Sequence, residues 1–144
     1  MKRQKKKLKQ KRKKEKGEEK RKKSLLSLKG PKPIGPYSQG IEFDNFIFLS
    51  GQIGIDPEKG ELKEGIEEQT KQILENIKNI LESYGLSMDN ILKTTIFLKN
   101  SEDFQKVNEI YSNYFKEPYP ARTTVIVKEL PKNALIEIEV IAHK

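Results

Sequence analysis

Two charged residues interrupt apolar, β-branched segments in the last third of the chain. Arg122 opens the segment Arg-Thr-Thr-Val-Ile-Val, and Glu137 alternates with Ile136 and Ile138. An arginine at the start of a strand presents a planar fork that can hold a carboxylate. A neighbouring glutamate can orient or deprotonate water. The pair would suit a small α-keto or α-imino acid. An Arg–Glu cross-strand ion pair, or a row of solvent-facing charges, would equally explain the spacing.

Four other residues are candidates for the same site. Tyr37 lies in Gly-Pro-Tyr-Ser-Gln and could cap a small pocket, or simply pack within its loop. Ser50 and Gly51 follow an apolar run, where a glycine lets the backbone approach a ligand or another chain, or marks a bulge. Asn108 lies among apolar residues of a predicted helix, where a local hydrogen bond would also account for it.

The composition argues against several classes of site. The chain has no cysteine, which excludes disulfides, thiolate metal sites and cysteine nucleophiles. Its one histidine, His143, argues against a histidine triad or a multi-histidine metal site. No phosphate loop, dinucleotide fingerprint or apolar run of about 20 residues occurs. We therefore expect no metal, no cofactor and a cytoplasmic location.

The positive charge is concentrated at the N-terminal end. The 144 residues carry a formal charge of +8, but residues 1–23 contain 15 Lys and Arg and three Glu, a net +12. Residues 24–144 therefore carry 14 basic and 18 acidic side chains, a net −4. With one leucine and no aromatic residue, the basic segment predicts disorder. We expect a disordered extension over 1–30 and one domain over 31–144.

Three roles are open for this basic extension. A polycation could bind the phosphates of RNA or DNA, with an affinity that falls steeply in salt. It could also be a targeting or anionic-membrane segment, or a solvated extension without a ligand. No aromatic residue is interleaved to stack on bases, so the segment contains no specific RNA-binding motif.

Hydrophobic periodicity in the domain predicts the order β-β-α-β-α-β-β. The predicted strands cover residues 41–43, 46–53, 90–98, 122–128 and 135–142, and the predicted helices cover 66–84 and the segment from Ser101 to Pro118. Two helices can cover only one face of such a sheet, which indicates an α+β fold with both helices on one face. The other face of the sheet must be covered by another layer, and a partner subunit is the simplest candidate.

Several short motifs resemble those of one known family. They are Ile-Gly-Pro-Tyr-Ser-Gln at 34–39, Leu-Ser-Gly-Gln at 49–52, Glu-Gln-Thr at 68–70, Leu-Glu-Asn at 74–76, Pro-Ala-Arg-Thr-Thr-Val at 120–125 and Ile-Glu-Ile-Glu at 136–139. From about Pro33 to Ala142 the chain resembles the RidA/YjgF family of reactive-intermediate imine deaminases. The resemblance implies a chorismate-mutase-like α+β homotrimer with three clefts between subunits.

The resemblance also implies an activity and a set of residues. Family members hydrolyse imine and enamine intermediates, such as 2-aminoacrylate and 2-iminopropionate, to 2-keto acids and ammonia without a cofactor. By this resemblance Arg122 would bind the substrate carboxylate and Glu137 would position water. The cleft would further contain Tyr37, Ser50, Gly51 and Asn108.

Two departures and two alternatives accompany this interpretation. Thr124 stands where many members have cysteine, and Ser24–Lys29 replaces the usual N-terminal strand, which we therefore leave unassigned. Some relatives are described as endoribonucleases that inhibit translation, so an RNA-acting protein aided by the basic segment is one alternative. A non-catalytic trimer that binds a small ligand is another. The preferred imino acid cannot be predicted from the sequence.

Overall fold

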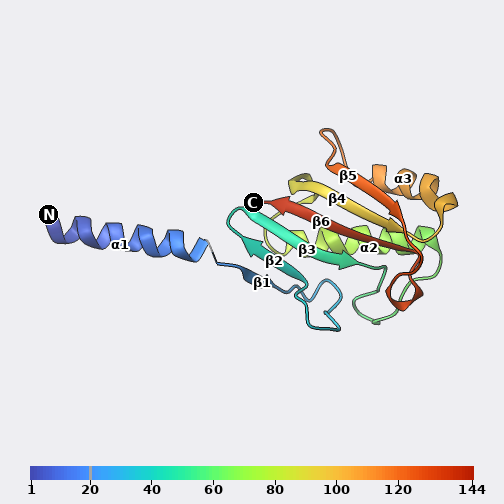
Figure 1. The fold of residues 1–144 in the computed structure, drawn as a ribbon, viewed down its shortest axis with the longest axis horizontal. Coiled ribbons are helices and arrows are strands. Elements are labelled where there is room, and N and C mark those ends of the chain that lie inside the picture. The colour runs from blue at the N-terminus through green and yellow to red at the C-terminus, as the bar shows by residue number, and fades with distance from the viewer. Residues whose placement is uncertain (20) are drawn as a thin grey trace.

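The computed structural model describes residues 1–19 and 21–144, and its centre is one mixed sheet of six strands (Figure 1). The strands are β1 (Lys23–Leu25), β2 (Gly40–Phe43), β3 (Phe46–Gln52), β4 (Ile91–Leu98), β5 (Ala121–Ile126) and β6 (Ile136–His143). Their spatial order is β1-β2-β3-β6-β4-β5, and only β4 and β5 run parallel. The strand latest in the sequence, β6, is therefore one of the two at the centre.

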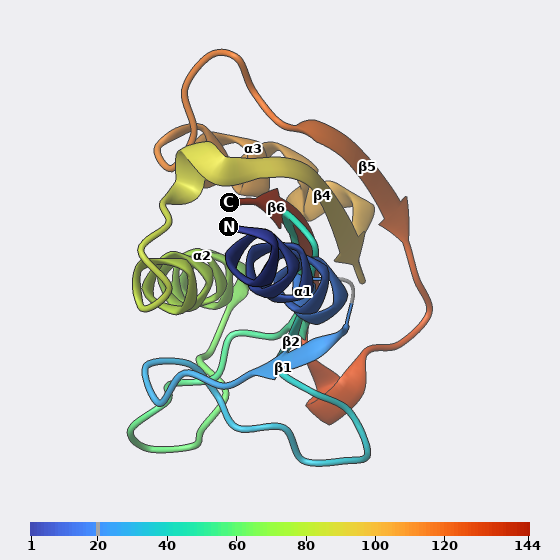
Figure 2. The same cartoon turned by 90° about the vertical axis from the view of Figure 1, so that its left-hand side faces the viewer.

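Two helices, α2 (Ile66–Glu82) and α3 (Phe104–Ser112), pack on one side of this sheet (Figure 2). In α2 the residues Ile73, Ile77 and Ile80 recur at helical spacing and are fully buried. They meet the alternate residues of β6, of which Ile136 and Ile138 are also fully buried. The α+β prediction, with both helices on one face, is confirmed.

The opposite face of the sheet has no covering layer in the described chain. Phe46 pairs with His143 and Phe48 pairs with Ile141 across β3 and β6, so these side chains share that face. Phe46 and Phe48 are 43% and 41% exposed, which is unusual for phenylalanine. The expected uncovered face is present, and the subunit that would cover it stays a prediction.

The N-terminal segment differs from the disorder expected over residues 1–30. Residues Lys2–Glu19 form a helix, α1, that projects away from the domain (Figure 1). Lysine, arginine and glutamine favour helix, and the side chains described in α1 are exposed, so local propensity and not packing accounts for it. Strand β1 also forms: it pairs with β2, and Leu25 joins the core. The sheet and its core therefore include residues N-terminal to Pro31.

Strands β5 and β6 are close in sequence but are not neighbours in the sheet. A short 3-10 turn, Pro131–Asn133, lies between them in the chain. However, β4 lies between the two strands and pairs with both. This insertion separates Arg122 on β5 from Glu137 on β6, and it removes the cross-strand ion pair considered above.

Candidate functional site

Glu137 lies on the uncovered face of the sheet, over the backbone of Gly51. Its neighbours Ile136 and Ile138 point into the core, so the pleat directs Glu137 to the other side. A Cβ atom on Gly51 would lie 2.7 Å from the Glu137 Cδ. The register between β3 and β6 shifts between Leu49 and Gln52, which includes Gly51. Glycine is therefore required for this close approach.

The environment of Glu137 favours its protonated form. Burial raises the pKa of the Glu137 carboxyl above its ordinary value, and the nearby charge of Glu139 raises it further. A carboxyl group with a raised pKa is a better proton acceptor once ionised, and it returns the proton more slowly than an exposed glutamate does. Glu137 can therefore act as a base toward a nearby water molecule.

A loop that contains Tyr37 forms the opposite wall of a small pocket around Glu137. Tyr37 is half-exposed, and its Oη accepts a hydrogen bond from the Ile34 N–H at 3.3 Å. The pocket also has apolar walls from Ile53 and Ile55, and its volume is about 80 Å³. Pockets for drug-sized ligands enclose roughly 300–1,000 Å³, so this one suits only a group of a few atoms.

Ser50 supports the Tyr37 loop in this structure. Its hydroxyl donates a hydrogen bond to the Ser38 carbonyl at 2.6 Å, and its backbone N–H donates to the Gln39 carbonyl at 3.0 Å. Both bonds connect β3 to the segment directly after Tyr37. The resemblance places Ser50 in the cleft, and these two bonds give it the geometry of a residue that supports the pocket loop.

Arg122 lies on the helix-covered side of the sheet, between two aromatic rings of α3. Its Cζ lies 5.0 Å from the Tyr111 ring centroid and 5.7 Å from the Phe104 centroid, within cation–π range. Tyr111 is in turn fixed by a 2.8 Å hydrogen bond between its hydroxyl and that of Thr94. The arginine itself is exposed, so its guanidinium is held at the domain surface with its hydrogen-bonding edge accessible.

Asn108 and Thr124 belong to the surroundings of Arg122. Asn108 follows Phe104 by four residues and precedes Tyr111 by three, so it shares the helix face that carries both rings. Thr124 follows Arg122 by two residues on β5 and therefore points to the same side of the sheet. Its hydroxyl oxygen is buried and has no hydrogen-bond partner among the described residues.

The candidate residues thus form two groups that do not meet within one chain. Tyr37, Gly51 and Glu137 form the first group, while Arg122 and Asn108 form the second on the opposite face. Arg122 pairs with Thr94 of β4 and Glu137 pairs with Phe97. Arg122 and Glu137 are therefore offset by three residues along the strands, about 10 Å, and by two strand spacings across the sheet, also about 10 Å. A small molecule cannot contact both groups unless a second copy of the chain brings them together.

Sequence reasoning missed the aromatic support of Arg122. Of the two rings that contact Arg122, Tyr111 is buried, whereas Phe104 is 42% exposed. The spacing Phe104, Asn108, Tyr111 places all three on one helical face, and this could have identified them as one surface. Nothing in the sequence indicated that β5 would bring Arg122 to that surface.

The described part of the chain, residues 1–19 and 21–144, contains neither a cluster of metal-ligating side chains nor a membrane-spanning helix. No group of three or more His, Asp or Glu side chains lies there close enough to hold a metal ion. Within the same residues no helix is both long and apolar enough to cross a membrane.

Comparison with known proteins identifies clear relatives. The model of the Endoribonuclease L-PSP family matches residues 27–144. A RutC family protein of Pyrococcus abyssi is 58% identical over 117 residues, which cover 81% of this chain and 92% of that protein. The human 2-iminobutanoate/2-iminopropanoate deaminase is 48% identical, over 79% of this chain and 84% of its own length. The crystal structure of RidA from the Antarctic bacterium Psychrobacter sp. PAMC 21119 superposes with a TM-score of 0.82 at 40% identity, covering 85% and 99% of the two chains.

Proposed function

Since the chain belongs to the RidA/YjgF family, represented by the Endoribonuclease L-PSP model, we propose that it is a 2-iminoacid deaminase. Its substrates would be enamines and imines of the 2-aminoacrylate and 2-iminopropionate type, and its products 2-keto acids and ammonia. The human relative named above carries this activity in its name. The enzyme would need no cofactor and would act in the cytoplasm.

One observation supports this function above the others. A carboxyl group with a raised pKa lies in a pocket of only about 80 Å³, and an accessible arginine fork lies on the other side of the same sheet. A 2-imino acid needs both groups: a carboxylate clamp, and a base beside the C=N carbon. In an oligomer, Arg122 of one subunit would complete the Glu137 pocket of the next.

The reaction then follows from these two groups. Arg122 holds the substrate carboxylate by two hydrogen bonds, which places the C=N carbon over Glu137. Water attacks that carbon while Glu137 accepts one of its protons. Proton return from Glu137 or through water converts the nitrogen to a leaving amine. The carbinolamine hydroxyl then gives its remaining proton to Glu137 or to water as the C–N bond breaks, so that ammonia departs and the former water oxygen becomes the carbonyl of the keto acid. An enamine enters the sequence after protonation of its terminal carbon.

A coupled assay tests the proposal. Threonine dehydratase releases 2-aminocrotonate and 2-iminobutanoate from threonine, and these intermediates hydrolyse slowly by themselves. Adding the protein should accelerate the appearance of 2-ketobutanoate without changing the dehydratase rate. An unchanged rate of keto-acid release, with the dehydratase in excess and the protein folded, would contradict the proposal.

We further propose that the active assembly is a trimer with a site between each pair of subunits. The exposed Phe46 and Phe48 on the uncovered face and the split between Arg122 and Glu137 support this arrangement. Light scattering at micromolar concentration should give about three times the chain mass of 16.7 kDa. A mass near 17 kDa would reject both the trimer and the shared site.

Nucleic-acid binding is a second, separate proposal, and the observation that favours it is α1. Between Lys2 and Lys14 the helix contains ten Lys or Arg and no acidic residue, and these side chains are exposed. Binding would be sequence-independent. A plot of log K against the logarithm of the salt concentration should have a slope of about −0.9 for each phosphate that the helix contacts. The full chain should bind a 20-base-pair duplex at 50 mM salt, and the complex should dissociate at 300 mM salt. Affinity that survives high salt would argue against this role for α1.

RNA cleavage and non-catalytic ligand binding are less well supported. An arginine fork fits a planar carboxylate, and phosphodiester cleavage would still need a second proton-transfer group beside it. A binder without activity would have no use for the raised pKa of Glu137. Release of keto acid in the coupled assay, without degradation of an added RNA, would distinguish the deaminase from both.

A further inference from the structure

We propose that Gln69 of α2 is a positioning residue that fixes the Glu137 carboxylate relative to the wall of its pocket. This inference rests on the proposed deaminase function. Gln69 is only 3% exposed although its side chain is polar, and it lies on the helix side of the sheet, where it cannot contact a substrate. Its role must therefore act through the segments that it holds.

The Gln69 amide joins two segments that are far apart in the sequence. Its Nε2 donates a hydrogen bond to the Lys63 carbonyl at 2.9 Å, and its Oε1 accepts one from the Leu135 N–H at 2.8 Å. Leu135 precedes β6 directly and lies two residues before Glu137. Lys63 closes the loop after β3, since its N–H donates to the Gly54 carbonyl at 2.8 Å. One side chain therefore connects the Glu137 strand to the loop opposite it.

The loop is also packed tightly against Gln69. A Cβ atom on Gly54 would lie 2.6 Å from the Gln69 Cα and 2.8 Å from its carbonyl oxygen, both of them backbone atoms. The residues on either side of Gly54, Ile53 and Ile55, line the Glu137 pocket. A displacement of Gln69 would therefore move the pocket wall as well as the start of β6.

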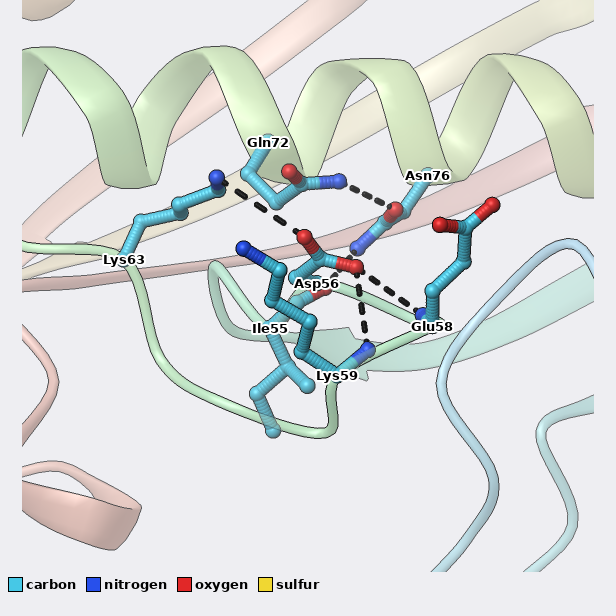
Figure 3. Close-up of polar contacts among 7 residues, drawn as sticks. All are labelled: Ile55, Asp56, Glu58, Lys59, Lys63, Gln72 and Asn76. Atoms are coloured by element: carbon cyan, nitrogen blue, oxygen red, sulfur yellow. Dashed lines mark hydrogen bonds and ion pairs between the residues drawn. The ribbon is translucent and has the colours of Figure 1, made fainter.

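Other polar groups of α2 hold the loop without reaching β6 (Figure 3). Asn76, which is fully buried, donates to the Ile55 carbonyl at 2.8 Å and accepts from the Gln72 amide at 2.8 Å. Asp56 caps the turn by accepting from the N–H groups of Glu58 and Lys59. These contacts stabilise the loop. A substitution of Asn76 should therefore disturb the pocket wall at Ile55 without disturbing strand β6, which makes it a control for changes at Gln69.

Loss of the bridge should reduce turnover more than binding. Glu137 already approaches Gly51 so closely that no side chain fits between them, which leaves little freedom on that side. A shift of about 1 Å in a catalytic group can cost about 100-fold in rate. Removal of the Gln69 amide also leaves the Lys63 carbonyl and Leu135 N–H without a partner, so both segments will move to find one.

The test compares Gln69→Met with Asn90→Leu in the full chain. Each change replaces an amide by an apolar side chain of similar size. Asn90 donates to the His143 carbonyl at 3.1 Å, at the other end of the same strand β6. We expect Gln69→Met to lower kcat at least tenfold, while Asn90→Leu keeps kcat within twofold at a comparable loss in Tm. Asn76→Leu should raise KM with little change in kcat.

Several results would overturn the inference. An unchanged kcat in Gln69→Met, with active wild-type protein, would show that the bridge does not position Glu137. An equal loss of kcat in Asn90→Leu would show that any destabilisation of β6 suffices. If Gln69→Met does not fold, Gln69→Glu replaces it. Its carboxylate still accepts from the Leu135 N–H but cannot donate to the Lys63 carbonyl, so the bridge is broken at the loop end, and an unchanged kcat would then count against the inference. An inactive wild-type protein would instead refute the deaminase, and the inference with it.

Discussion

Gly51→Ala is the most direct perturbation of the Glu137 pocket. The new Cβ would lie 2.7 Å from Cδ and 2.8 Å from Oε2 of Glu137, whereas ordinary contacts begin at 3.4 Å. The carboxyl group must therefore move by at least the difference, about 0.7 Å. Its atoms end a flexible side chain on the open face, so the movement costs little folding energy, roughly 1 kcal/mol or less.

The effect on catalysis should be much larger than the effect on stability. A misplacement of this size in a group that activates water is expected to lower kcat on the order of 100-fold. We expect the Tm of Gly51→Ala to change by only a few degrees, since about 1 kcal/mol shifts the Tm of a domain of this size by that amount. The coupled keto-acid assay measures kcat, and thermal unfolding measures the Tm.

A double-mutant cycle with Glu137→Gln completes this experiment. If alanine at residue 51 acts by displacing the carboxylate, it should have little further effect on kcat once Glu137 is glutamine. If instead the loss of kcat in the double variant equals the product of the losses in the two single variants, Gly51 contributes in another way, for example through its backbone. Wild-type kcat in Gly51→Ala would refute the assignment of Glu137 as the base.

Four further outcomes follow from the geometry. Arg122→Lys keeps the charge but loses the two-bond fork, so kcat/KM should fall by roughly 10- to 100-fold and Arg122→Ala should lose nearly all activity, with the oligomer intact by light scattering. Because burial raises the pKa of Glu137, the acidic limb of the kcat–pH profile should lie above pH 4.5 and disappear in Glu137→Gln. The folded state holds this proton more tightly than the unfolded chain does, so the unfolding free energy should decrease as pH rises through the raised pKa, and Glu137→Gln should reduce that decrease in urea titrations. Tyr111→Leu should weaken inhibition by a keto acid, since it removes one ring from Arg122, whereas Tyr111→Phe should retain most binding.

Local sequence patterns were sufficient for the individual elements of the domain. The isoleucines of α2 and the alternation of Ile136, Glu137 and Ile138 in β6 reflect interactions with the nearest layer, so their period is visible in the chain. Asp44 adopts positive φ in the turn between β2 and β3, a conformation that aspartate tolerates better than most residues do. The sequence thus predicted the buried face of α2 and that of β6.

The order of the strands could not be predicted in the same way. The insertion of β4 between β5 and β6 depends on contacts between residues far apart in the chain. The hydrophobic periodicity of a single segment contains no information about such contacts. This insertion places Arg122 and Glu137, only 15 positions apart, on strands that are not neighbours. They lie on opposite faces because their partners on β4, Thr94 and Phe97, are three positions apart and side chains alternate along a strand. The helix α1 was missed because the expectation considered burial and not the intrinsic helix propensity of lysine and arginine.

The central place of β6 has a consequence for the way in which the protein is made. Synthesis proceeds from the N-terminus, and until residues 136–143 have left the ribosome, β3 and β4 each present an unpaired edge to the surroundings. The emerging chain then consists of two partial sheets, β1–β3 and β4–β5, that cannot yet join. Release of β6 both closes the sheet and delivers Glu137, so the proposed water-activating site cannot form before the sheet is complete.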